Sequence, residues 1–180
     1  VTGLVDKGAD KGALILTERT LKDAESGLDL ATLTSTTFAR GNGGYDGPSD
    51  EAPRPHKVPE REPDFAVDLT TLDMAALIYR LSGDYNPLHA SPSVARAAGF
   101  PKPILHGLCS LGVAGHAILK GCCDYDAKRL KSLQLRFSSP VYPGETMRTE
   151  IWRDGANISF KSKIVERDVV VLDNGHATVE

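Results

Sequence analysis

Residues 105 to 119 read Leu-His-Gly-Leu-Cys-Ser-Leu-Gly-Val-Ala-Gly-His-Ala-Ile-Leu, and this stretch decides the fold. Its apolar residues recur at helical spacing and cover one face. They are Leu108, Leu111, Ala114, Ile118 and Leu119. Gly107, Gly112 and Gly115 lower the intrinsic helix propensity, so the helix depends on burial against a neighbouring element. The pattern predicts a buried helix from about Leu105 to Leu119.

Beyond this helix the apolar residues follow a period of two. Leu133, Leu135 and Phe137 alternate with the polar residues Gln134, Arg136 and Ser138. Such alternation is typical of a strand with one buried face. Pro143-Gly144 makes a turn, and further strands are predicted at 147–153, 158–166 and 169–179. Consecutive strands joined by short turns indicate an antiparallel sheet.

Upstream of the buried helix the pattern is mixed. The segment from Phe65 to Val67 is predicted to be a strand. Asp68 or Thr70 can cap a helix that runs to about Leu81, and Ser91 can cap a shorter one. The order is therefore a strand, helices and then antiparallel strands, which is an α+β arrangement. An antiparallel sheet wrapped around a central helix is the form of a hot-dog fold.

A change in composition divides the chain. Residues 46–63 concentrate proline and charged residues, which is a linker signature. Before this segment, Gly12 to Leu16 and Leu30 to Arg40 are predicted to be strands. Two strands without a helix make an incomplete domain. The expected parts are remnant strands at 1–48, a linker at 49–63 and the main domain at 64–180.

Composition excludes several classes of protein. The 180 residues carry a formal net charge of -3, which gives no broad basic surface for nucleic acid. No run approaches the roughly 18 apolar residues that a membrane span requires. Cys109, Cys122 and Cys123 cannot all pair within one chain, so a reducing compartment is favoured. We expect an intracellular protein without nucleic-acid or membrane partners.

A carboxylate, a carboxamide and an imidazole lie close together between Ser82 and His89. Asp84 precedes His89 by five positions, and Pro87 fixes the turn between them. The Asp84 and His89 side chains can therefore converge on one small molecule, for which water is the simplest candidate. Ordinary turn chemistry is the alternative explanation for Asp84, Asn86 and Pro87.

Gly107 comes near the predicted start of the apolar helix. A helix N-terminus presents free N–H donors and a positive dipole end, which can stabilise a carbonyl oxygen as it gains negative charge. Glycine at this position permits a substrate to approach the donor closely. The alternative explanation is that a small residue lets the helix pack tightly.

Four segments carry a resemblance to a known family. They are Asp84-Tyr85-Asn86-Pro87-Leu88-His89, Gly99-Phe100, Ile104-Leu105-His106-Gly107 and Arg136-Phe137-Ser138-Ser139-Pro140-Val141-Tyr142-Pro143-Gly144. Together they resemble the hydratase 2 motifs of MaoC-like proteins, over residues 64 to 180. The resemblance implies a hot-dog fold and an R-specific 2-enoyl-CoA hydratase of fatty acid metabolism. Such an enzyme adds water reversibly to a trans-2-enoyl-CoA, and its only CoA is part of the substrate, so no cofactor is expected.

Residues 1–48 carry a second resemblance, through Gly12-Ala13-Leu14-Ile15-Leu16 and Phe38-Ala39-Arg40-Gly41-Asn42-Gly43-Gly44. These segments resemble the last strands of the N-terminal half in eukaryotic double hot-dog hydratases. The chain would then be the C-terminal half of a double hot-dog with a remnant of the other half. Hot-dog domains pair through their sheets, so a homodimer is expected. The relatives imply a peroxisomal location, or a cytoplasmic one for a bacterial chain.

The hydration chemistry gives each candidate residue a role. Asp84 is expected to take a proton from water, and His89 is expected to share that water and to relay or donate a proton. Either residue can supply the proton for C2. Asn86 would hold the loop or the substrate in register, and the Gly107 N–H would bind the thioester oxygen.

Several other polar residues receive weaker assignments. Arg129, Lys131 and Arg136 are candidates for contacts with CoA phosphates, although charged residues at a strand entrance are usually only solvated. Structural roles are expected for His106, at the helix entry, and for His116, in the helix body. No metal site is expected.

Two other functions stay open. One is a hot-dog thioesterase or acyl-carrier dehydratase, which would act on a different thioester. The other is a non-catalytic module that binds acyl thioesters, which the incomplete N-terminal part makes plausible. Binding of a CoA ester without turnover would favour the module.

Overall fold

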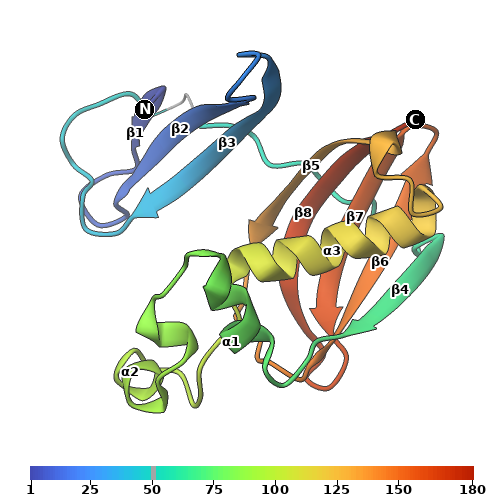
Figure 1. Cartoon of the computed structure of the whole chain (residues 1–180). Coiled ribbons are helices and arrows are strands. Elements are labelled where there is room, and N and C mark those ends of the chain that lie inside the picture. The colour runs from blue at the N-terminus through green and yellow to red at the C-terminus, as the bar shows by residue number, and fades with distance from the viewer. Residues whose placement is uncertain (50–51) are drawn as a thin grey trace. The chain divides into compact units, whose positions relative to one another are not determined.

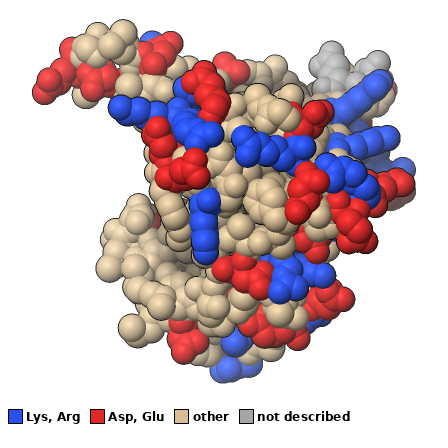
Figure 2. Space-filling model, turned by 90° about the vertical axis from the view of Figure 1, so that its right-hand side faces the viewer, with Lys and Arg blue, Asp and Glu red and all other residues tan. Residues whose placement is uncertain are grey.

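The computed structural model describes residues 1–49 and 52–180. The chain divides into two compact units, Val1–Arg54 and Pro55–Glu180 (Figure 1). Within the described residues, no helix combines the length and the apolar character needed to cross a membrane. On the face drawn in Figure 2, acidic and basic side chains are interspersed, in keeping with the small net charge.

The first unit contains a three-stranded antiparallel sheet with the order β1-β2-β3. Its strands are β1 (Gly3–Asp6), β2 (Ala13–Lys22) and β3 (Asp29–Ala39). The strands predicted at Gly12 to Leu16 and at Leu30 to Arg40 are confirmed as β2 and β3, although β2 runs further than predicted. The sequence does not reveal β1, because 4 residues are too few to establish a period.

The second unit contains a five-stranded antiparallel sheet with the order β4-β6-β7-β8-β5. Its strands are β4 (Phe65–Thr70), β5 (Leu130–Phe137), β6 (Thr146–Asp154), β7 (Asn157–Ile164) and β8 (Val169–Val179). The strands predicted from the period of two are confirmed as β5 to β8. In β7 every second residue is buried, as expected for a strand with one face on the core.

The long helix α3 (Gly107–Cys122) lies across one face of this sheet (Figure 1). Its buried residues are Ser110, Ala114, Gly115, Ala117, Ile118 and Cys122. A Cβ atom added at Gly115 would lie 3.3 Å from Leu133, and one at Gly121 would lie 2.6 Å from the Phe65 ring. The absence of a side chain at Gly115 and Gly121 thus lets the helix approach the sheet. A sheet wrapped around a buried helix confirms the predicted α+β, hot-dog architecture.

The prediction of a helix beginning at Asp68 or Thr70 is wrong at its start. Both residues belong to β4, where Asp68 forms an ion pair with Arg148 of β6 at 2.6 Å. Pairing with a distant strand therefore overrides the local capping signal. The remaining helical segments are α1 (Ala75–Tyr79), the 3-10 turns η1 (Arg80–Ser82) and η2 (Pro87–His89), α2 (Pro92–Ala97) and η3 (Ala127–Arg129).

Gly175 in β8 has no room for a side chain. It pairs with Phe160 of β7, and an added Cβ atom would collide with the Phe160 carbonyl oxygen and lie 2.6 Å from its buried ring. We expect Gly175→Ala to lower the free energy of unfolding by about 3 kcal/mol, because neither the strand nor the ring can move aside. Urea denaturation measures the change. The control is Gly112→Ala, whose Cβ atom would meet nothing within 4 Å. A Gly175→Ala variant as stable as the wild type would contradict this packing.

Candidate active site

The loop that the sequence marks as a site begins directly after η1. Gly83 ends that turn with φ +110, a left-handed conformation that glycine adopts without strain. The Asp84 carboxylate accepts a hydrogen bond from the Asn86 N–H at 3.2 Å. The Asn86 side-chain oxygen in turn accepts one from the Leu88 N–H at 3.0 Å. These local hydrogen bonds shape the turn that leads to His89.

A backbone carbonyl orients the His89 ring. The Nδ1 atom of His89 lies 2.8 Å from the carbonyl oxygen of Ile104. Because a carbonyl oxygen can only accept, Nδ1 carries the proton and the neutral ring presents a lone pair at Nε2. The His89 ring is half-buried. Because Nδ1 makes the hydrogen bond that holds the ring, Nε2 can accept a proton without breaking that bond.

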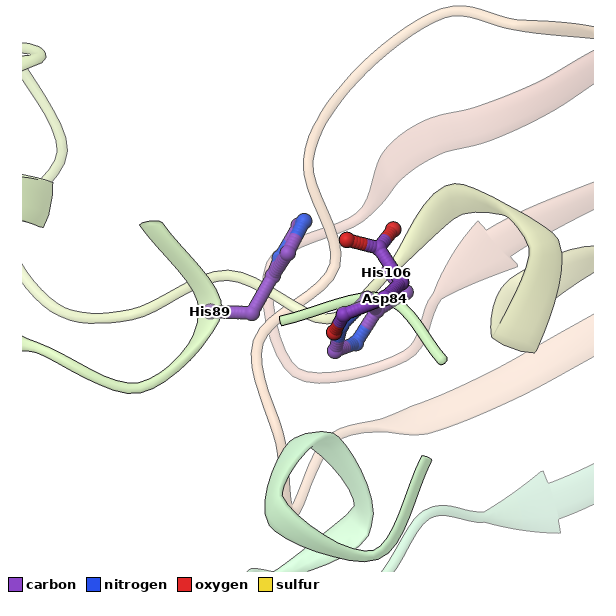
Figure 3. Close-up of side chains that lie close together, drawn as sticks. All are labelled: Asp84, His89 and His106. Atoms are coloured by element: carbon purple, nitrogen blue, oxygen red, sulfur yellow. The ribbon is translucent and has the colours of Figure 1, made fainter. Parts of the chain in front are cut away.

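Two segments distant in the sequence meet at Asp84, His89 and His106 (Figure 3). One polar atom from each of the three side chains lies within 4.8 Å of the others. The His106 ring stacks on His89 with 3.8 Å between ring centroids, and its Nε2 lies 3.2 Å from the Asp84 carbonyl oxygen. The structure thus brings Asp84 and His89 together, with a histidine to which the sequence assigns only a structural role.

Three such side chains can hold a metal ion, but the geometry of the two rings is unfavourable for it. An imidazole lone pair lies in the plane of its ring, and the rings of His89 and His106 are stacked with only 26° between their planes. Their lone pairs therefore do not converge on one point, as metal ligands must. His89 Nδ1 and His106 Nε2 are also engaged with backbone carbonyl oxygens. The arrangement is better suited to holding a water and moving its protons.

A pocket of about 300 Å³ lies beside His89. Its lining is mostly apolar and includes Phe100, Phe137 and the backbone of Gly107. Gly107 is the first residue of α3, so its N–H has no acceptor within the helix, and no other described backbone group accepts from it. A Cβ atom at Gly107 would lie 3.3 Å from the Phe137 ring. Gly107 therefore contributes a free donor to the pocket at a place with little room for a side chain.

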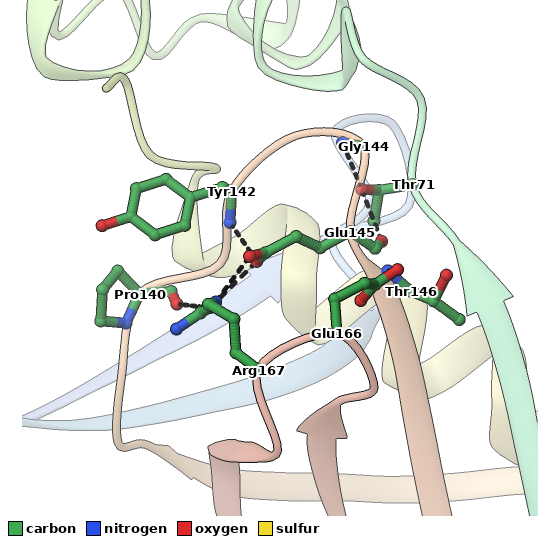
Figure 4. A network of polar contacts seen from close by, with 8 residues as sticks. All are labelled: Thr71, Pro140, Tyr142, Gly144, Glu145, Thr146, Glu166 and Arg167. Atoms are coloured by element: carbon green, nitrogen blue, oxygen red, sulfur yellow. Dashed lines mark hydrogen bonds and ion pairs between the residues drawn. The ribbon is translucent and has the colours of Figure 1, made fainter. Parts of the chain in front are cut away.

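A polar network holds the pocket wall formed by residues 138–141 (Figure 4). The Glu145 carboxylate accepts a hydrogen bond from the Tyr142 N–H at 2.8 Å and pairs with Arg167 at 2.6 Å. Arg167 also donates to the Pro140 carbonyl oxygen at 2.8 Å. Because these bonds converge on the segment after β5, they fix the shape of the wall that faces the substrate space.

Of the three residues predicted to contact CoA phosphates, the structure keeps Arg129 and Lys131 together and places Arg136 far from them. Arg129 donates to the Glu180 carbonyl oxygen at 2.7 Å, and Lys131 pairs with the Glu180 carboxylate at 2.9 Å. Arg136 lies at the other end of β5, on the order of 20 Å from Arg129 for an extended chain. Arg136 is exposed, but as the strand neighbour of the pocket residue Phe137 its side chain points to the opposite face of β5, so the three residues do not form one phosphate-binding cluster.

Comparison with known proteins gives closely related sequences and structures. Residues 55–175 match the sequence pattern of the family described as MaoC like domain. The chain is 43% identical, over 97% of its length, to 3-hydroxyacyl-thioester dehydratase Y of Mycobacterium tuberculosis. It is 41% identical, over 96% of its length, to the peroxisomal enoyl-CoA hydratase 2 of Arabidopsis thaliana. These matches cover 62% and 58% of the relatives, so the chain spans about three fifths of their length.

A solved structure extends the likeness to the fold. The crystal structure of a MaoC-like dehydratase from Phytophthora capsici aligns with a TM-score of 0.91 at 42% identity, covering 98% of this chain and 61% of that one. The matched region 55–175 includes Asp84, His89 and Gly107 and, apart from the last residues of β8, the sheet that surrounds α3. From its sequence pattern, its relatives and its hot-dog fold, the chain belongs to the MaoC-like family.

Proposed function

We propose that the chain catalyses the reversible hydration of a trans-2-enoyl-CoA to the (3R)-3-hydroxyacyl-CoA. The observation that carries the proposal is the meeting of the Asp84 carboxylate and the His89 imidazole beside a pocket that the free Gly107 N–H also lines. The names of the relatives support it, because hydration of an enoyl thioester and dehydration of a 3-hydroxyacyl thioester are opposite directions of one kind of reaction.

The addition of water to the double bond requires three events. A base removes a proton from water while the water oxygen bonds to C3. The electron pair of the double bond moves toward the thioester carbonyl, whose oxygen gains negative charge. Finally C2 takes up a proton, so that the elements of one water molecule have been added.

Asp84 and His89 suit the two proton transfers. A water held between the Asp84 carboxylate and His89 Nε2 loses a proton to Asp84, while the Nδ1–H bond to Ile104 keeps His89 turned toward that water. The addition is complete when Asp84 or His89 returns one proton to C2, so that no net proton is gained or lost. The Asn86 oxygen is engaged by Leu88, which leaves the Asn86 NH2 group available to hold the substrate or loop in register.

Gly107 suits the stabilisation of the thioester oxygen. Its N–H lies at the start of α3, where the helix dipole is positive. A donor that binds the oxygen more strongly as it becomes negative lowers the barrier, by about 3 kcal/mol in comparable sites.

The test is the loss of enoyl-thioester ultraviolet absorbance after the chain is mixed with crotonyl-CoA. We expect turnover without release of free CoA thiol, which a thiol reagent detects. Two results would contradict the proposal. Stoichiometric thiol release would indicate a thioesterase, and calorimetric binding of crotonyl-CoA without any turnover would indicate a binding module.

We also propose, for the intact protein, an acyl-CoA substrate, a homodimer and a location that follows the relatives. That location is peroxisomal for a eukaryotic chain and cytoplasmic for a bacterial one. Within the second unit, β4 and β5 are edge strands, and unpaired strand edges favour association. Light scattering over a range of concentrations tests the dimer, and a monomer at every concentration would contradict it.

A further inference from the structure

His106 is a buried titratable residue that the proposed mechanism does not use. Only 1% of its surface is exposed. It is the N-cap residue of α3, directly before Gly107, yet its side chain makes no capping hydrogen bond. The ring instead reaches the site loop, where Nε2 lies 3.2 Å from the Asp84 carbonyl oxygen.

This hydrogen bond sets the protonation of the His106 ring. The carbonyl oxygen accepts, so Nε2 carries the proton and Nδ1 carries the lone pair. Nδ1 is buried and has no hydrogen-bond partner among the described residues, so a second proton there would be a poorly solvated charge. Burial lowers the pKa of His106, and the charges of His89 and Arg80 act in the same direction, while Asp84 opposes them. The ring therefore stays neutral.

The neutral ring contacts both members of the candidate catalytic pair. It holds the backbone of Asp84 through Nε2, and it stacks on His89 with 3.8 Å between ring centroids. His106 also contacts Tyr79: the two ring centroids lie 4.8 Å apart, with 45° between the ring planes. His106 thus links the loop that carries Asp84 and His89 to the start of α3, where Gly107 lies (Figure 3).

We propose that His106 is a positioning residue, which holds the Asp84 backbone by a hydrogen bond and supports the His89 ring by stacking, so that both groups act on one water. The proposal rests on the hydratase function. A neutral ring gives this support without placing a positive charge beside His89. Because misplacing reacting groups by about 1 Å can lower a rate on the order of 10²-fold, loss of the support should reduce kcat more than substrate affinity.

Two substitutions separate the two contacts. His106→Phe keeps a flat ring that can stack on His89 but loses the donor to Asp84. His106→Gln keeps an N–H donor near the position of Nε2 but loses the ring. The same substitutions at His116, which is exposed on α3, are the matched controls. Circular dichroism and thermal unfolding establish that each variant is folded. If His106→Phe does not fold, His106→Leu, which lacks both the donor and the aromatic ring, takes its place.

The readouts are kcat and KM for crotonyl-CoA across the pH range of activity. We expect kcat to fall about tenfold or more in His106→Phe and to recover within about threefold of the wild type in His106→Gln, with KM changed less than about twofold. The pH limbs of kcat should not move, because a neutral His106 transfers no proton.

Different failures have different meanings. Unchanged kcat in folded His106→Phe, or in folded His106→Leu where it takes its place, would overturn the positioning role. A displaced pH limb would also overturn it, because His106 would then donate or accept a proton itself. An inactive wild-type chain would instead overturn the hydratase function on which the inference rests, so the two failures are distinguishable.

Discussion

Replacing Asp84 with asparagine is expected to lower kcat for crotonyl-CoA hydration by about 10³-fold, within the range of about 10² to 10⁴ that general-base catalysis contributes. Asparagine has nearly the shape of aspartate but cannot take a proton from water. KM should change little, because the carboxylate acts on the water and not on the CoA ester. Steady-state absorbance assays, with substrate in excess and the variant at a raised concentration, measure both values.

The Asp84→Asn variant should remain folded. The Asp84 side chain is exposed, and its Oδ1 accepts a hydrogen bond from the Asn86 N–H that an asparagine oxygen can also accept. The matched control is Asp154→Asn, at the exposed end of β6, which should be fully active. Near-normal turnover by folded Asp84→Asn would show that Asp84 is not the base.

Two substitutions distinguish the effect of losing the Gly107 N–H from the effect of adding atoms beside it. Gly107→Ala keeps the N–H and adds a Cβ atom 3.3 Å from the Phe137 ring. Gly107→Pro adds the same Cβ atom, and its ring carbon Cδ takes the place of the N–H hydrogen. Proline is compatible with the first helical position, and His106 before it has φ -60 and ψ 137, the extended conformation that a following proline requires.

We expect kcat to fall about tenfold in Gly107→Ala through crowding of the bound thioester, and about 10²-fold further in Gly107→Pro through loss of the donor. The ratio of kcat between these two variants measures the effect of replacing the N–H donor by a ring carbon, with the Cβ atom common to both. Gly112→Ala, on the same helix with nothing within 4 Å of its Cβ atom, should keep the wild-type kcat. Equal activity in Gly107→Ala and Gly107→Pro would show that this N–H does not bind the thioester oxygen.

The fold could be predicted where a segment is long enough for its apolar residues to establish a period. The helix α3 has 16 residues and β8 has 11, so their apolar patterns repeat several times. The start of α1 could not be predicted, because Asp68 and Thr70 carry a good capping signal and are nevertheless drawn into β4 by pairing with β6. Local patterns contain no information about such distant partners.

The residues of the candidate site also differ in whether the sequence alone could reveal them. Asp84, Asn86 and His89 could be found because one turn holds them, and Gly107 because it begins a helix. His106 could not be recognised as part of the site, since its bond to Asp84 spans 22 positions of the chain. Its one local signal is a polar residue that directly precedes the helix, and that signal fits a structural role equally well.

The most direct test of the proposed site is the configuration of its product. Crotonyl-CoA is incubated with the wild-type chain and with Asp84→Asn, the thioester is cleaved, and the 3-hydroxybutyrate is resolved by chiral chromatography. Water delivered by Asp84 and His89 to one face of a thioester bound at Gly107 should give the (3R) product alone, and the variant should give almost none. A (3S) or racemic product, or none from folded wild-type protein that binds crotonyl-CoA, would contradict the proposal.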